Sequence, residues 1–167
     1  MRTPIDYDFL DAGKEHEFVG VFMKSVFTWE SKVRDYELDS QGIVNHATFL
    51  NYFEQCRNDY ARSMGIDFRE YHLAGYDLMI ADIQIQYRSP LRAKDEFYVT
   101  AQVDAYNEKR ILFGQEIKYK ADNHSVAKAL VSVACVDQKT GRACMPNRLK
   151  NRLPAEKYVK HRLMLKL

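Results

Sequence analysis

The feature that most constrains this chain is one long amphipathic helix followed by alternating segments with short links between them. Residues 45–64 are predicted to be helical, because their apolar side chains recur at every third or fourth position and so share one face. Gly65 follows as the expected stop, since glycine readily takes the left-handed conformation that ends many helices. The apolar positions are Phe49, Phe53, Cys56, Tyr60 and Met64. A helix of this kind must bury that face against another element.

The segments around the helix are predicted to form an antiparallel sheet. Most of those after it alternate apolar and polar residues, while the last is less polar, as a central strand would be. The segment before the helix is rich in aromatic and β-branched residues. The predicted strands span 25–36, 78–88, 97–106, 111–120 and 125–136. The links between the later strands span 89–95, 107–110 and 121–124, and such short links favour antiparallel neighbours because parallel strands need long crossovers.

A curved antiparallel sheet wrapped around the helix is the packing that buries both apolar faces in one core. This arrangement is an α+β fold. The polar helix residues Asn51, Glu54 and Arg57 are expected to face away from the sheet. A single sheet leaves its edge strands unpaired, and pairing with a second copy is one common way to cover them. We therefore expect a homodimer.

Length and composition narrow the class of protein. The 167 residues predict a single domain, and a hydrophobic content of 46% with 13% aromatic residues excludes a disordered chain. A net charge of +2 gives no support for a nucleic-acid partner. No apolar run is long enough to cross a bilayer, and the N-terminal residues lack the apolar stretch of a leader peptide. A cytoplasmic protein without membrane association is expected.

Several common chemical signatures are missing from the sequence. The five histidines and three cysteines show no metal-ligand spacing, so neither a metal nor another cofactor is expected. Cys56 and Cys135 fall on apolar segments and are predicted to be reduced core residues. Phosphate-binding glycine motifs and the G-x-S-x-G motif of serine hydrolases are also absent.

A polar turn directly ahead of the helix is the candidate site. Asp39 lies three residues before Gly42 and seven before His46, so a carboxylate and an imidazole flank the turn. The free N–H groups of a helix N-terminus favour negative charge, and a carboxylate facing them could attack or hydrate a polarised carbonyl. Judged from local pattern alone, Asp39 and Asn45 are more often simple turn and N-cap residues. Gly42 is predicted to have a positive φ or to allow close backbone approach.

At these residues the chain resembles a known family. The run D-x-x-G-x-V-x-H, from Asp39 to His46, and the run F-x-x-Y-F-E-x-x-R, from Phe49 to Arg57, resemble the hotdog-fold acyl-CoA thioesterases. The similarity is greatest to the subfamily of 4-hydroxybenzoyl-CoA thioesterase and YbgC-like enzymes. QYRSPLRAKDEF and VDQKTGRACMP are similar to later segments of that family. The likeness covers about residues 25–146 of a single hotdog domain over 1–167, leaving an N-terminal extension at 1–24 and a basic tail at 147–167.

The resemblance implies roles for individual residues. Asp39 corresponds to the catalytic carboxylate, as nucleophile or as general base for water. His46 occupies the position whose backbone N–H polarises the thioester carbonyl, and its side chain would orient water, bond the carbonyl oxygen, hold Asp39 or serve only the loop. Gly42, Asn45 and His46 together form the expected oxyanion-binding region, although Asn45 is favoured as a helix cap. Glu54 is the reserve catalyst, because some hotdog thioesterases use a helical glutamate.

The resemblance also implies substrate-binding residues, and the chain departs from the family pattern at two other positions. Arg88, Ser89, Pro90 and Arg92 are the candidates for contact with coenzyme A phosphates, with unpaired exposed charge as the plainer alternative. Leu38 stands where a small hydroxyl residue commonly precedes the aspartate. Lys94 replaces the usual glycine before Asp95.

The predicted function is hydrolysis of acyl-CoA or acyl-carrier-protein thioesters, at a site on the interface of a homodimer or tetramer. A non-catalytic acyl-CoA-binding hotdog protein is the main alternative. A hotdog dehydratase is less favoured, because His46 lacks the Pro/Gly-rich loop expected beside its histidine. The basic tail, with a short helix predicted after Pro154, is either a solvated face or a surface that attracts coenzyme A phosphates or an acidic acyl carrier protein.

Overall fold

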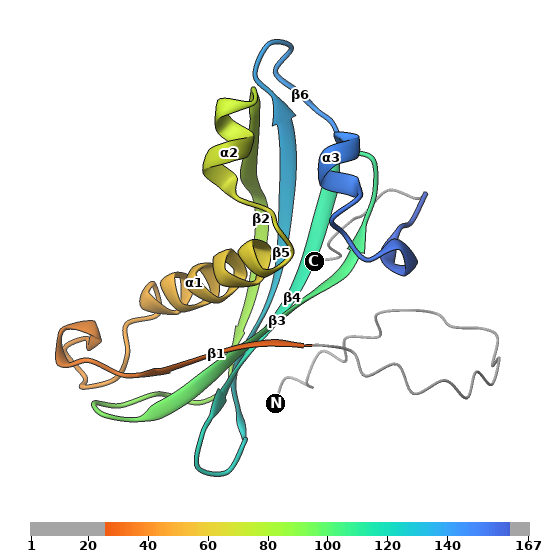
Figure 1. Ribbon diagram of the computed structural model, residues 1–167. Coiled ribbons are helices and arrows are strands. Elements are labelled where there is room, and N and C mark those ends of the chain that lie inside the picture. Colours follow the sequence, from red (N-terminus) through yellow and green to blue (C-terminus); the bar gives the residue numbers. More distant parts are fainter. Residues whose placement is uncertain (1–25, 161–167) are drawn as a thin grey trace, which may run out of the picture.

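The computed structural model describes residues 26–160 and contains the predicted curved antiparallel sheet with one long helix against its inner face (Figure 1). The sheet is six-stranded, with the order β1-β3-β4-β5-β2 and β6 paired to β5. Its strands are β1 (Phe27–Lys32), β2 (Tyr76–Tyr87), β3 (Glu96–Tyr106), β4 (Arg110–Tyr119), β5 (Ser125–Asp137) and β6 (Arg142–Ala143). The helices are α1 (Thr48–Ser63), α2 (Phe68–Leu73) and α3 (Asn147–Lys150), with single 3₁₀ turns η1 (Asp35–Glu37) and η2 (Ala155–Lys157).

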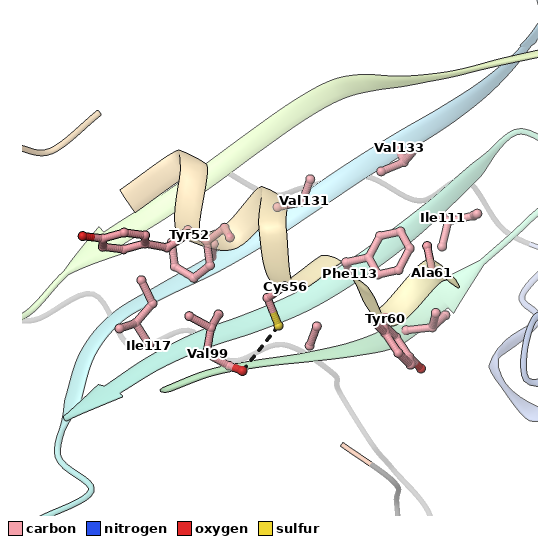
Figure 2. Close-up of a cluster of buried hydrophobic side chains, with 14 of the residues drawn as sticks. Tyr52, Cys56, Tyr60, Ala61, Val99, Ile111, Phe113, Ile117, Val131 and Val133 are labelled. Carbon is pink, nitrogen blue, oxygen red and sulfur yellow. Dashed lines mark hydrogen bonds between the residues drawn. The ribbon is translucent and has the colours of Figure 1, made fainter. Parts of the chain in front are cut away.

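The core lies between α1 and the inner face of the sheet (Figure 2). The predicted helix stripe is confirmed, since Phe49, Phe53, Cys56 and Tyr60 are all buried. Cys56 also donates its thiol proton to the Val99 carbonyl of β3 at 3.3 Å, which ties the helix to the sheet. The predicted alternation is confirmed over most of two strands, because every second residue is buried from Phe97 to Val103 in β3 and from Ile111 to Ile117 in β4.

Two details of the helix differ from the sequence prediction. It begins at Thr48 rather than near Asn45, because residues 45–47 form a turn. The prediction that Arg57 faces away from the sheet is wrong: its side chain is 5% exposed and its Nη1 donates to Gln115 Oε1 of β4 at 3.0 Å. Asn51 and Glu54 are exposed as predicted. The stop at Gly65 is confirmed by its φ of +73°.

The two edges of the sheet are β1 and β2. Within residues 26–160, the outer edge of β2 pairs with no strand. This edge carries large exposed apolar side chains, with Met79 at 55%, Ile80 at 46% and Tyr87 at 48% exposure. Helix α2 lies beside the first half of β2 (Figure 1), where Met79 and Ile80 nevertheless stay exposed. β2 therefore presents a partly apolar edge.

The described part of the basic tail, residues 147–160, contacts the end of the sheet near Tyr106. The Val159 N–H donates to the Tyr106 carbonyl at 2.8 Å, and the Tyr158 ring packs edge-on against the Tyr106 ring. Lys150 pairs with Glu108 at 2.8 Å, so this cation of the basic tail has a carboxylate partner. The helix predicted after Pro154 is a single 3₁₀ turn, Ala155–Lys157, and the rest of that prediction lies in 161–167, outside the described residues.

Candidate active site

A tight turn holds the Asp39 carboxylate in place. The Asp39 N–H donates to the Ile43 carbonyl at 2.8 Å, and the Gly42 N–H donates to the Asp39 carbonyl at 3.1 Å. Gly42 has the predicted positive φ, +73°, which a side chain would strain. Asp39 Oδ1 accepts the Gln41 N–H at 2.8 Å and the Ile43 N–H at 3.4 Å. Among residues 26–160 its other oxygen, Oδ2, has no protein partner, so that oxygen is available for chemistry.

Main-chain hydrogen bonds hold this turn from within and from a neighbouring loop. Leu38 and Val44 form an antiparallel bridge across it, and the Asn45 N–H donates to the Glu37 carbonyl at 2.9 Å. On the outer side the Val44 N–H donates to the Leu91 carbonyl at 2.8 Å. The turn is therefore the tip of a short hairpin whose arms lead from η1 into the start of α1.

The entrance of α1 leaves main-chain donors open, and one of them belongs to His46. Asn45 Oδ1 accepts the Ala47 N–H at 2.9 Å, and the Asn45 carbonyl accepts the Thr48 N–H. The predicted role of Asn45 as the side-chain cap of the helix is therefore wrong: it closes the turn just before the helix, where the N-cap position is Ala47. The His46 N–H has no acceptor in the part of the chain that the structure describes. His46 thus presents its backbone donor at a helix N-terminus, where partial positive charge gathers.

A cleft of about 410 Å³ brings these groups together. Asp39 and His46 line it together with apolar side chains of the hairpin and α1, and the end of β2 and its following loop complete the lining. The lining residues are Asp39, Ile43, Val44, His46, Phe49, Tyr87, Arg88, Ser89 and Pro90. An anionic oxygen, a main-chain donor and an apolar wall in one cleft can bind an acyl group and act on its carbonyl.

Some of the predicted site residues do not line the cleft. The Arg92 main chain bridges to Ile43 and its N–H donates to Asp95 Oδ2 at 2.8 Å, so it closes the neighbouring loop. Glu54 lies on the exposed face of α1, away from the lining residues. Lys94, the departure from the family glycine, adopts a φ of +68°, the conformation in which glycine is favoured.

Sequence reasoning missed the part played by Tyr87. Its hydroxyl donates to the His46 carbonyl at 3.0 Å, and its ring stands edge-on to Phe49 at 5.3 Å between centroids. Partial burial raises the pKa of Tyr87 above its usual value, so its hydroxyl stays protonated and can donate. Tyr87 therefore joins the end of β2 to the helix entrance. The available signal was its place just before Arg88, Ser89 and Pro90.

A buried pair behind the turn was also missed. Tyr52 of α1 donates its hydroxyl to Glu37 Oε2 at 2.6 Å, and both side chains are buried. Desolvation and the neighbouring Glu37 carboxylate raise the pKa of Tyr52 far above its usual value.

Across residues 26–160 there is no cluster of three metal-ligating side chains, and no helix there is long and apolar enough to span a membrane.

Comparison with known proteins places the chain in a family. Residues 33–153 match the family model of the thioesterase-like superfamily. Long-chain acyl-CoA thioesterase FadM of Escherichia coli is 32% identical over 113 residues, covering 67% of this chain and 84% of FadM. The chloroplastic acyl-acyl carrier protein thioesterase ATL3 of Arabidopsis thaliana is 32% identical over 123 residues, but only 65% of that relative's length is spanned.

A solved structure with recognisable sequence similarity has the same fold. The crystal structure of YbaW, a probable thioesterase from Escherichia coli, superposes with a TM-score of 0.67 at 29% identity, covering 75% of this chain and 95% of YbaW. The curved sheet around one long helix is therefore the hotdog fold. The chain belongs to the thioesterase-like superfamily.

Proposed function

We propose that the chain hydrolyses acyl thioesters to a free acid and a thiol, with Asp39 as the catalytic carboxylate. The observation that carries this proposal is one cleft in which Asp39 Oδ2 and the His46 N–H are both without protein partners among residues 26–160. FadM and the Arabidopsis relative are both named as thioesterases, one for acyl-CoA and one for acyl carrier protein. Both descriptions agree with a site built for an acyl carbonyl.

The geometry supplies the two functions that thioester hydrolysis needs. The His46 N–H donates to the carbonyl oxygen as negative charge develops there, and a single such donor is typically worth about 3 kcal/mol. Asp39 Oδ1 is held by the Gln41 N–H, so Oδ2 is the oxygen that attacks the carbonyl carbon or takes a proton from the attacking water. If water attacks, collapse of the tetrahedral species leaves the free acid, and the expelled thiolate takes the proton that Asp39 removed from the water. If Asp39 attacks, collapse expels the thiolate and leaves a mixed anhydride with Asp39, which water then hydrolyses to the free acid and the carboxylate. Both routes use the same oxygen.

Arg88 and Ser89 at the cleft rim would contact the carrier. Coenzyme A and the prosthetic arm of acyl carrier protein both end in a pantetheine thiol with phosphate at the far end, and an arginine favours phosphate by charge and bidentate geometry. The Arg88 guanidinium is engaged only by Gln86 Oε1, at 2.8 and 3.1 Å, among the described residues. It therefore keeps donors for an incoming phosphate.

A second copy is proposed to pair along β2 and complete the cleft. β2 is an open edge, and its exposed Ile80 and Met79 lie on the strand that ends at Tyr87 in the cleft. Ile80→Glu should shift the protein from dimer to monomer in analytical ultracentrifugation and lower turnover with it. Thr28→Glu on the opposite edge strand, β1, is the matched control and should leave the dimer intact. A monomeric wild-type protein with full activity would exclude this pairing.

The test of the reaction is the release of free thiol from benzoyl-CoA, palmitoyl-CoA and palmitoyl acyl carrier protein. Asp39→Asn keeps the shape of the side chain and should lower kcat/KM by at least about 100-fold, the usual loss for a positioned catalytic group. Asp67→Asn is the control, because Asp67 also accepts main-chain N–H groups at a turn but lies outside the cleft. Asp39→Asn activity within a few-fold of wild type, or acyl-CoA binding without thiol release, would contradict the proposal.

A further inference from the structure

Glu37 is a buried carboxylate that the proposed chemistry does not use. It is the only carboxylate classed as buried among residues 26–160, with 8% exposure. Three hydrogen bonds satisfy it: Oε2 accepts the Arg34 N–H at 2.8 Å and the Tyr52 hydroxyl at 2.6 Å, while Oε1 accepts Arg34 Nη1 at 3.1 Å. Burying a carboxylate is unfavourable without such partners, so the position needs an explanation.

Glu37 lies at the base of the hairpin whose tip carries Asp39. Its carbonyl accepts the Asn45 N–H at 2.9 Å, which joins the two arms just before the chain reaches His46. Its side chain reaches Tyr52 on the first half of α1. One residue therefore connects the arm that carries Asp39 both to the arm that carries His46 and to the helix behind it.

Tyr52 is a rigid anchor for this connection. It is 3% exposed, and its ring packs against Phe97 at 4.6 Å, Phe49 at 6.1 Å and Trp29 at 6.4 Å between centroids. In Figure 2 it belongs to the cluster of side chains between α1 and the sheet. A hydroxyl fixed in this way cannot follow a carboxylate that moves. The short O–H···O⁻ contact is also of the stronger, charge-assisted kind.

We infer that Glu37 is a positioning residue for the proposed reaction, which acts by holding the Asp39 turn against Tyr52 and so sets the gap between Asp39 and the His46 N–H. This inference rests on the proposed function. Reacting groups displaced by about 1 Å can lose on the order of 100-fold in rate. Loss of the Glu37–Tyr52 contact should therefore lower kcat, while KM changes little because the cleft walls remain.

Three variants test the inference. Tyr52→Phe removes only the hydroxyl and keeps the packed ring, and Glu37→Gln keeps the size of the side chain. Each should lower kcat at least 10-fold with KM within threefold of wild type, and the double variant should be no slower than the slower single variant. Tyr60→Phe is the control: it is a buried tyrosine on the same helix, stacked on Phe27 and outside the cleft, and should leave kcat unchanged.

The outcomes separate this inference from the function on which it rests. If wild type releases thiol and Asp39→Asn does not, while Tyr52→Phe stays within twofold of the wild-type kcat, the positioning role alone is overturned. Equal losses in Tyr52→Phe and Tyr60→Phe would also overturn it, because they would show a general softening of the core. Absence of thiol release by wild type would overturn both claims. Glu37→Gln gives a second measurement of the same contact. If the Glu37→Gln protein does not fold, the result for Tyr52→Phe decides whether the inference stands.

Discussion

The buried Arg57–Gln115 contact makes a quantitative prediction about stability. Both side chains are nearly inaccessible, at 5% and 4% exposure. Arg57 Nη1 donates to Gln115 Oε1 at 3.0 Å, and Gln115 Nε2 donates to the Phe53 carbonyl at 2.8 Å. Among residues 26–160 no carboxylate forms an ion pair with Arg57, and burial lowers the pKa of its guanidinium. One neutral amide is therefore the hydrogen-bond partner of this buried cation, and the charge of Glu54 opposes the effect of burial on its pKa.

The magnitude follows from what each substitution removes. Gln115→Leu deletes a bond to a charged donor, worth about 1.5–3 kcal/mol, and a neutral bond worth about 0.5–1.5 kcal/mol, so the loss should be about 2–4.5 kcal/mol. The leucine buries well, but it cannot solvate the guanidinium that remains. Arg57→Met combined with Gln115→Leu replaces the whole pair by apolar groups, and should return the protein to within about 1 kcal/mol of wild type.

Urea unfolding followed by Trp29 fluorescence and circular dichroism measures these differences, at one protein concentration so that any association is held constant. Gln102→Leu is the control, because Gln102 lies on the adjacent strand β3 but is only half-buried, and its side chain bonds Asp104 rather than α1. It should change stability by less than about 0.5 kcal/mol. A double variant as unstable as Gln115→Leu alone would refute the reasoning, since the loss would then arise from shape and not from an unpaired cation.

Two further outcomes follow from single side chains. Lys94→Gly should stabilise the fold by about 0.5–1 kcal/mol in the same unfolding assay, because Lys94 has a φ of +68°. Asn123→Gly should stabilise it by less, since Asn123 has a φ of +61° and asparagine tolerates this conformation. Burial raises the pKa of Cys56 and of Cys135 to about 12, so roughly one thiol in ten thousand is ionised at pH 8. A disulfide-exchange reagent should therefore leave both thiols unmodified until the protein is denatured. Half-buried Cys144 should react first.

The fold could be predicted from sequence where a periodic pattern persists. The stripe of α1, the alternation of three later strands and the less polar run of the fourth extend over many residues, so these elements can be predicted. α2 was missed because its six residues are too few to show a period, although Asp67 accepts main-chain N–H groups at its start and was a usable signal. Arg57 was misplaced because it follows Phe53 by four residues, on the buried face, yet was assigned outward by its charge.

The candidate site was also predictable from the sequence only in part. The family resemblance pointed to Asp39, His46 and the Arg88–Pro90 segment, and the structure brings these residues into one cleft. Their catalytic and binding roles remain predictions. Arg92 was grouped with that segment by proximity in sequence, but the chain turns between them, so its main chain pairs with Ile43 instead. Tyr87 could not be assigned, because its partner is a carbonyl 41 residues away.

Glu37 and Arg57 escaped prediction for a common physical reason. Each matters through a hydrogen bond between α1 and another element, with partners 15 residues apart for Glu37–Tyr52 and 58 residues apart for Arg57–Gln115. Local patterns record which face a residue occupies, but not which polar partner meets it there. The two contacts hold α1 at two points along its length, one to the hairpin and one to the sheet. The position of the His46 N–H relative to Asp39 therefore depends on how α1 packs against the sheet and the hairpin, and not on the turn sequence alone.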